Sequence, residues 1–153
     1  MRIIDLLEPG RVLADLRASN KRGVLEELVT TLASGPQGLD LKATVEVLME
    51  RERLGSTGIG DHIAIPHGKL PNLSAMILAF GRSLKGVDFD SMDSKPSHLF
   101  FLLLAPENSA GLHLKALAKI SRMLLSQSFR ESLLKAASAE EIFRLLAERD
   151  AEL

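Results

Sequence analysis

Two uninterrupted runs of apolar residues constrain the fold more than any other feature of this sequence. They are AMILAF at residues 75–80 and LFFLLL at residues 99–104. Each has the length of a strand, and neither alternates with polar residues as a strand with one solvent-exposed face would. Both are therefore predicted to be strands of a sheet covered on both faces. Arg11–Leu16 is a weaker extended stretch, and the polar residues 86–96 are expected to form a hairpin-like connection or a lid.

Segments with the apolar periodicity of helices stand before and after these runs. They are residues 20–34, 40–53, 109–126, 129–136 and a last segment from residue 138. Their apolar positions are predicted to face the core; these are Val24, Leu25, Leu28, Val29, Leu32, Leu41, Val45, Leu48, Met49, Leu112, Ala116, Leu117, Ile120, Met123, Leu124, Ile142, Leu145 and Leu146. Helices around buried strands are the layer pattern of an α/β domain. No internal repeat, low-complexity segment or linker interrupts the chain.

Local signals mark where these helices begin and end. Asn20 and Asp40 are the expected N-caps of the first two helices, and Gly35-Pro36 is the expected stop of the first. Ser138-x-x-Glu141 has the spacing of a capping box and predicts the start of the last helix.

Composition excludes several classes of function. The 153 residues contain no cysteine, so disulfides, thiolate metal sites and cysteine nucleophiles are ruled out. With no Trp, no Tyr and a net charge of −1, the chain lacks the aromatic platform and the basic footprint of nucleic-acid binders. The longest apolar run, Leu99–Ala105, is too short to cross a bilayer as a helix. We therefore expect a soluble cytoplasmic protein that neither binds nucleic acid nor inserts into a membrane.

The glycine-rich segment GSTGIGDHIAIPHG, residues 55–68, is expected to be a loop in which Ile63–Ile65 is extended. Its spacing matches neither G-x-G-x-x-G nor the P-loop, and the chain has no G-x-S-x-G motif. Asp61, His62 and His67 could chelate a metal ion. Without an H-E-x-x-H helix or cysteines, however, we expect no metal site.

His67 and His113 are the candidates for chemistry near neutral pH. Pro66 fixes the backbone before His67, and Gly68 lets a partner approach closely, which suits an oriented nucleophile and an ordinary loop histidine equally. His113 is expected in the first turn of its helix, where free N–H groups and the helix dipole favour an anion over imidazolium. A surface histidine following a cap is the alternative. Together the two histidines suggest an imidazole pair around a phosphate.

Two blocks of sequence identify a family. The first is RERLGSTGIG at residues 51–60 followed by IAIPHG at 63–68, and the second is LLLAP at 102–106 followed by His113-Leu114-Lys115. They resemble the signature of enzyme IIA domains of the phosphoenolpyruvate-dependent phosphotransferase system (PTS), in the fructose, mannitol and nitrogen-regulatory class. The resemblance implies one domain over residues 1–153, with a central mixed sheet flanked by helices on both faces.

The resemblance also implies roles for individual residues. His67 matches the histidine that accepts a phosphoryl group through Nε2 from a phosphorylated HPr-like carrier protein. His113 matches the histidine that contacts this group, and Arg51 matches a family arginine whose guanidinium suits phosphate. The residues implied to shape the phosphate pocket are Thr57, Gly58 and Gly68. Neutral imidazole would attack phosphorus in line, and neither a metal ion nor a cofactor is implied.

His62 departs from the family pattern, because the position before IAIPH is commonly glycine there. We expect His62 to bring a second imidazole near the site without a catalytic role. We expect His98, at the start of the LFFLLL run, to be structural.

The resemblance extends to one branch of the family. The chain ends at Leu153 without a IIB-like cysteine or a transmembrane segment, and Gly68-Lys69-Leu70 resembles the nitrogen-regulatory branch. This implies a free-standing regulator whose phosphorylation-dependent partner is a sensor kinase, a potassium transporter or another regulator. Two alternatives stay open. One is a fructose- or mannitol-type IIA component that passes phosphate to a separate IIB protein, and the other is a binding regulator with a vestigial phosphosite.

Overall fold

The centre of the fold is an antiparallel pair of long strands. In the computed structural model, which describes residues 1–33, 35 and 38–153, β5 spans Ile77–Val87 and β6 spans Ser97–Pro106. They contain most of the two apolar runs, and Phe80 of β5 lies opposite Phe101 of β6. The prediction of two strands is confirmed, although β5 begins two residues later than its run and continues to Val87, into the segment expected to be a connection.

Four short strands complete a mixed sheet in the order β1-β5-β6-β3-β2, with β4 also paired to β6. Strand β1 (Val12–Leu13) is parallel to β5, and both β3 (Ile63–Ala64) and β4 (His67–Leu70) are parallel to β6. Strand β2 (Gly58–Gly60) is antiparallel to β3. The extended backbone predicted within residues 55–68 is confirmed at β3. The prediction of a loop is wrong at β2 and at the start of β4, because pairing with β3 and β6 gives these residues backbone hydrogen bonds.

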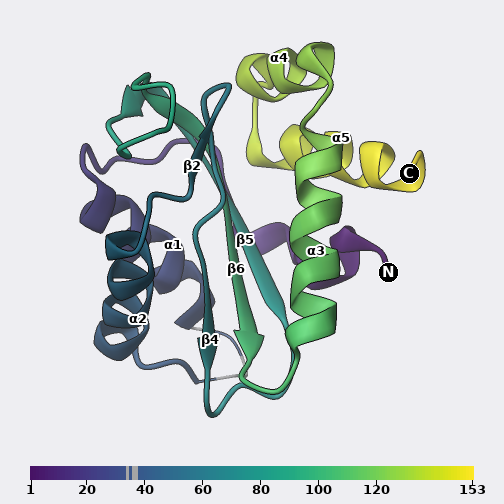
Figure 1. Ribbon diagram of the computed structural model, residues 1–153. Helices are drawn as coiled ribbons and strands as arrows, with labels where there is room; N and C mark the ends of the chain where they lie inside the picture. Colours follow the sequence, from purple (N-terminus) through teal and green to yellow (C-terminus); the bar gives the residue numbers. More distant parts are fainter. Residues whose placement is uncertain (34, 36–37) are drawn as a thin grey trace.

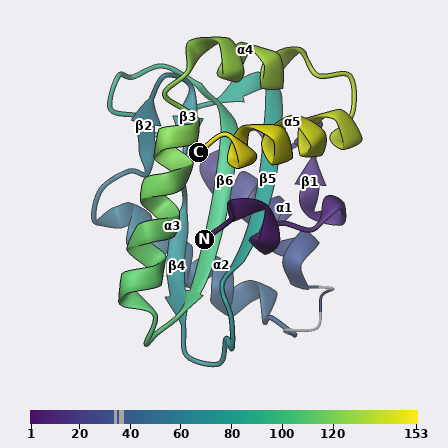
Figure 2. The same cartoon turned by 90° about the vertical axis from the view of Figure 1, so that its right-hand side faces the viewer.

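Helices cover both faces of the sheet. Over the described residues they are α1 (Lys21–Ala33), α2 (Leu41–Arg53), α3 (Ala110–Met123), α4 (Gln127–Lys135) and α5 (Ala139–Ala151), and the short 3-10 turns Ile3–Leu6 and Pro9–Arg11 precede β1. Helices α1 and α2 lie on one face, and α3, α4 and α5 lie on the other (Figures 1 and 2). The predicted α/β class, with a mixed sheet flanked by helices on both faces, is confirmed. No helix in this part of the chain is long and apolar enough to span a bilayer.

The predicted helix starts are confirmed. Side-chain oxygens of Asn20, Asp40 and Ser138 each accept a hydrogen bond from the backbone N–H three residues further on, at 2.8, 2.9 and 3.1 Å. The carboxylate of Glu141 accepts from the N–H of Ala137, whereas in a standard capping box it would accept from the N–H of Ser138 itself. The expected stop at Gly35-Pro36 cannot be followed through Pro36, which lies outside the described residues.

Strand β6 shows why its apolar run has no polar alternation. Leu99, Phe101 and Leu103 pack on the side of α3 to α5, whereas Phe100, Leu102 and Leu104 pack on the side of α1 and α2. All six side chains are fully buried. Burial of each such side chain stabilises the fold by about 1.5–3 kcal/mol, so β6 contributes to two cores at once.

Two of the predicted inward positions are wrong. Leu41 is 39% exposed and Leu112 is 53% exposed. Both lie in the first turn of their helices. In α3 the stripe that faces the sheet is His113, Ala116 and Ile120, so Leu112 is rotated out of it by one helical step.

We predict that Leu102→Ala lowers the free energy of unfolding by about 2–5 kcal/mol, because it leaves a cavity in a packed core. The matched control is Leu84→Ala, since Leu84 lies in β5 but is largely exposed. Its effect should stay within about 0.5 kcal/mol. Urea denaturation of both variants measures the difference. Equal losses would contradict the two-faced burial of β6.

Candidate functional site

His67 stands where the edge of the sheet is interrupted. Strands β3 and β4 both pair with β6, and Ile65-Pro66 separates them. The carbonyl of Pro66 still accepts a hydrogen bond from the N–H of Leu103 at 3.0 Å. Proline itself has no N–H, so Pro66 accepts a hydrogen bond from β6 but donates none in return. His67 follows directly as the first residue of β4.

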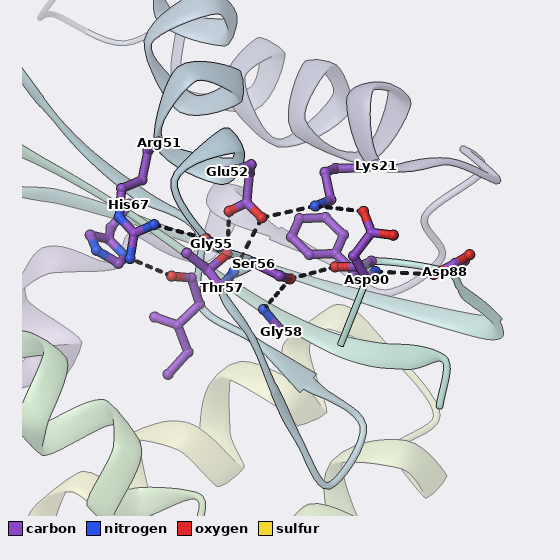
Figure 3. A network of polar contacts seen from close by, with 12 residues as sticks. Lys21, Arg51, Glu52, Gly55, Ser56, Thr57, Gly58, His67, Asp88 and Asp90 are labelled. Carbon is purple, nitrogen blue, oxygen red and sulfur yellow. Dashed lines mark hydrogen bonds and ion pairs between the residues drawn. The ribbon is translucent and has the colours of Figure 1, made fainter. Parts of the chain in front are cut away.

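One hydrogen bond defines the chemical state of His67. Its Nδ1 lies 2.8 Å from the carbonyl oxygen of Ile65 (Figure 3). A carbonyl oxygen can only accept, so Nδ1 carries the hydrogen and the neutral ring has its lone pair on Nε2. Burial lowers the pKa of His67 below its usual value; the bond to Ile65 and the charge of Glu52 oppose this, and the charge of Arg51 adds to it. Nε2 is therefore available as a nucleophile at neutral pH.

His113 is the second imidazole of the site. Its ring centroid lies 5.4 Å from that of His67, and the side chain is only 7% exposed. The surface-histidine alternative is therefore wrong. Burial, followed by the charges of His67 and Lys69, lowers the pKa of His113. Its Nε2 is buried and has no hydrogen-bond partner among the described residues, which is a costly state for a polar atom within a fold.

A cavity of about 690 Å³ opens at the two histidines. Its lining residues are Glu46, Val47, Glu50, Arg51, Leu54, His67, Gly68, Lys69 and His113. Arg51 and Lys69 bring two cations to it, and the Arg51 guanidinium also donates to the carbonyl of Gly55 at 2.8 Å (Figure 3). At Gly68 a Cβ would approach Val47 to 3.2 Å, so glycine lets α2 pack closely on β4.

Thr57 and Gly58 lie behind this cavity and do not line it. The N–H and the hydroxyl of buried Thr57 both donate to the carboxylate of Glu52 (Figure 3). A Cβ at Gly58 would stand 3.0 Å from the Cα of Ser91, so the glycine serves close packing. The structure thus brings His67, His113, Arg51 and Gly68 together and holds the other two predicted pocket residues one layer further in.

Glu52 is the residue that sequence reasoning missed. It is buried, and its carboxylate forms an ion pair with Lys21 at 3.1 Å. Lys21 in turn reaches Asp90 at 3.0 Å. The only signal in the sequence was its place beside Arg51 in a run of charges that reads as a solvated helix end.

His62 is separate from the site, and the expectation that it lies nearby is wrong. Its Nδ1 bonds to the carbonyl of Pro96 at 2.9 Å, and its ring packs against His98 at a centroid distance of 5.3 Å. Its φ of 65° lies in the left-handed region, which explains why glycine suits this position. His98 bonds through Nδ1 to the carbonyl of Ser83 at 2.8 Å, as expected of a structural residue. Within the described residues, no three His, Asp or Glu side chains are placed to hold a metal ion.

The fold and the site together define an α/β domain with a half-buried histidine, whose neutral ring has its lone pair on Nε2, at the edge of a mixed sheet. Residues 5–149 match the family described as "Phosphoenolpyruvate-dependent sugar phosphotransferase system, EIIA 2". The chain belongs to this family of enzyme IIA domains, as its sequence blocks predicted.

Relatives within the family include regulatory and sugar-specific proteins. The chain is 43% identical over 147 residues to the nitrogen regulatory protein of Bradyrhizobium diazoefficiens, covering 96% of this chain and 95% of that one. It is 37% identical to the PTS system fructose-specific EIIABC component of Bacillus subtilis, covering 98% of this chain but 24% of that protein. The crystal structure of nitrogen regulatory protein IIA-Ntr from Neisseria meningitidis superposes with a TM-score of 0.88 at 37% identity, covering 94% of this chain and 98% of that one. The chain thus closely resembles the nitrogen-regulatory members.

The lowered pKa of His67 generates a prediction about pH. In an NMR titration, the His67 ring should protonate with a midpoint below the usual histidine value of 6.5. Because the His67 ring binds its proton more readily in the unfolded chain, it lowers the free energy of unfolding as the pH falls below about 6.5. Above that pH it has no such effect. The variant His67→Gln should lack this contribution to the pH dependence of unfolding. A midpoint above 6.5 would contradict the burial of the ring.

Proposed function

We propose that this protein is a phosphoryl carrier that accepts a phosphoryl group on Nε2 of His67 from a phosphorylated HPr-like protein. The observation that carries the proposal is the bond from Nδ1–H of His67 to Ile65. It leaves the lone pair of the neutral ring on Nε2, in a side chain that lines the cavity. Membership of the enzyme IIA family supports the same chemistry.

The transfer would be an in-line exchange between two histidines. The P–N bond of the donor phosphohistidine breaks as the bond from phosphorus to Nε2 of His67 forms, and the donor ring keeps the electron pair of the broken bond. Such a transition state is loose and carries its negative charge on the three equatorial oxygens. Arg51, Lys69 and His113 line the cavity in which these oxygens would lie. Their contribution is electrostatic stabilisation by groups already in place.

Exposed leucines frame this polar centre. Leu54 lines the cavity and is 82% exposed, and Leu112 and Leu114 are exposed on either side of His113 in α3. Exposed apolar side chains beside a functional cavity are typical of a protein docking surface. We call Leu54, Leu112 and Leu114 the apolar rim. We propose that the donor protein binds this rim and excludes water from the transfer.

The proposed output is a contact that depends on the phosphorylation state. A phosphoryl group on His67 adds negative charge and acceptor oxygens inside the apolar rim, which weakens one interface and creates another. The likeness to nitrogen regulatory proteins favours a regulatory target such as a sensor kinase or a potassium transporter, reached in the cytoplasm. The likeness to a fructose-specific EIIABC component favours the alternative, transfer to a IIB protein.

The central test is phosphorylation in vitro. Incubated at neutral pH with phosphoenolpyruvate, enzyme I and an HPr-type carrier, the protein should gain about 80 Da, the mass of one phosphoryl group. His67→Ala should abolish the gain and leave the fold intact. His113→Ala should slow the transfer more than it lowers thermal stability. Intact-protein mass spectrometry and a melting curve measure both effects, and His62→Gly is the matched histidine control with normal transfer.

Three outcomes would change this proposal. A label that survives in His67→Ala would move the phosphosite to another histidine. No mass gain in the wild-type protein would favour the binding regulator with a vestigial phosphosite. Equal losses of stability and transfer in His113→Ala would assign His113 a structural role alone.

The apolar rim has its own test. Leu112→Asp and Leu114→Asp should each raise the KM for the phosphorylated donor roughly five- to tenfold, because each places a charge in a desolvated contact. Leu84→Asp is the control, since Leu84 is also exposed but lies in β5, whereas Leu112 and Leu114 lie next to His113 in α3. Steady-state transfer kinetics compare the three variants. An equal effect of all three would rule out docking at this rim.

A further inference from the structure

A buried carboxylate lies at the start of a chain of hydrogen bonds that ends on the ring of His67. Glu52 accepts from Nζ of Lys21 at 3.1 Å, from the N–H of Thr57 at 3.1 Å and from the Thr57 hydroxyl (Figure 3). Lys21 is held in turn by Asp90 at 3.0 Å and by the ring of Phe89, whose centroid is 4.9 Å away. With three donors the buried carboxylate is fully partnered, and such charge-assisted bonds are the strong ones.

Thr57 passes this constraint to Ile65. The carbonyl of Thr57 accepts from the N–H of Ile65 at 3.0 Å, and the carbonyl of Ile65 accepts from Nδ1–H of His67 at 2.8 Å. The Ile65 side chain is buried in the core, and Pro66 follows it. Three features therefore restrain Ile65: its hydrogen bond to Thr57, the packing of its side chain in the core, and the rigid Pro66 that follows it.

The placement of Thr57 argues against a role in packing alone. Its side chain is buried and lies outside the cavity, where a valine of nearly the same shape would fill the space. A buried hydroxyl lowers stability unless it is hydrogen-bonded. Here the Thr57 hydroxyl donates to the carboxylate of Glu52, where the chain of hydrogen bonds begins. The hydroxyl thus fixes the position of Thr57 relative to Glu52, which an apolar side chain would not do.

We propose that Thr57 and Glu52 are positioning residues for His67. They hold the Ile65 carbonyl in place, and that carbonyl fixes the orientation of the imidazole and keeps its hydrogen on Nδ1. Neither residue touches the phosphoryl group. The catalytic consequence rests on the proposed function, since Nε2 must point along the line of attack for transfer to be fast. A small misplacement of a reacting atom slows such a step by up to about a hundredfold.

Arg51 and Glu52 are neighbours in α2, but their side chains point to different surroundings. Arg51 faces the cavity, whereas Glu52 is turned into the interior toward Thr57 and Lys21 (Figure 3). The last turn of one helix therefore carries both a cation for the substrate and the anchor for the nucleophile. Displacement of this turn would disturb both at once.

The test compares Thr57→Val, which removes the hydroxyl and keeps the shape, with Thr57→Ser, which keeps the hydroxyl. Thr57→Val should lower kcat for phosphoryl acceptance about tenfold with the KM for the donor unchanged. In 15N NMR spectra of the unphosphorylated full chain, its His67 should show a mixture of the two neutral tautomers. Thr57→Ser should restore both the rate and the single tautomer with Nδ1–H.

Two further variants separate this role from a general loss of structure. Ser56→Ala removes a neighbouring hydroxyl that binds the carbonyl of Phe89 at 2.5 Å and lies outside the chain of bonds, so the His67 tautomer should not change. Glu52→Gln keeps the size of the anchor but removes its charge, and it should shift the tautomer as Thr57→Val does. It also serves as the second variant if Thr57→Val does not fold.

The outcomes for the two proposals are distinguishable. A folded Thr57→Val protein with the wild-type tautomer and kcat, whatever its melting temperature, would overturn the positioning role. If the wild-type protein accepts no phosphoryl group, the proposed function fails, and the tautomer in the unphosphorylated chain still decides whether Thr57 positions His67.

Discussion

Burial of β6 on both faces is the constraint on which the rest of the molecule depends. Its six central side chains alternate between two cores, so helices must cover the sheet on each side. Its backbone must also be paired along both edges. Strand β5 pairs with one edge, and the interrupted strand formed by β3 and β4 pairs with the other. The site exists because of that interruption, since it places His67 at the one point where the edge changes partner.

The site combines elements from both layers of the fold. Strand β4 supplies His67, α2 supplies Arg51 from one face of the sheet, and α3 supplies His113 from the other. Among the described residues Nε2 of His113 is buried without a partner, which is costly within a fold, and His67 and two cations line the same cavity. This combination fits the phosphoryl group of the proposed transfer, which would arrive and leave. The exposed leucines Leu54, Leu112 and Leu114 form the surface on which we propose that the donor protein binds.

Periodicity predicted the long elements well because their patterns are set by neighbours in the chain. The helices, their N-caps and the two apolar strands all follow from spacing of three to four residues or from runs of strand length. Within the glycine-rich segment, β2 and the start of β4 were misread as a loop because these strands are short and have no pattern of their own. They become strands through pairing, β2 with β3 and β4 with β6, and the residues of β6 that face β4 lie 36 positions further along the chain. Leu112 was misread for a related reason, since the inward position of that turn is occupied by a histidine.

By itself, the sequence determined the α/β class, the family and the candidate nucleophile, because each of these depends on local pattern or on a string of adjacent residues. Only the tertiary structure decided what each histidine contacts. It brought the rings of His67 and His113 into contact, and it bonded His62 to Pro96 and packed it against His98. It also directed the Thr57 hydroxyl to Glu52 and away from the cavity. The hydrogen on Nδ1 of His67 was decided in the same way, by a carbonyl that points at the ring. These contacts depend on the register of the sheet and on helix packing, and no spacing along the chain encodes them.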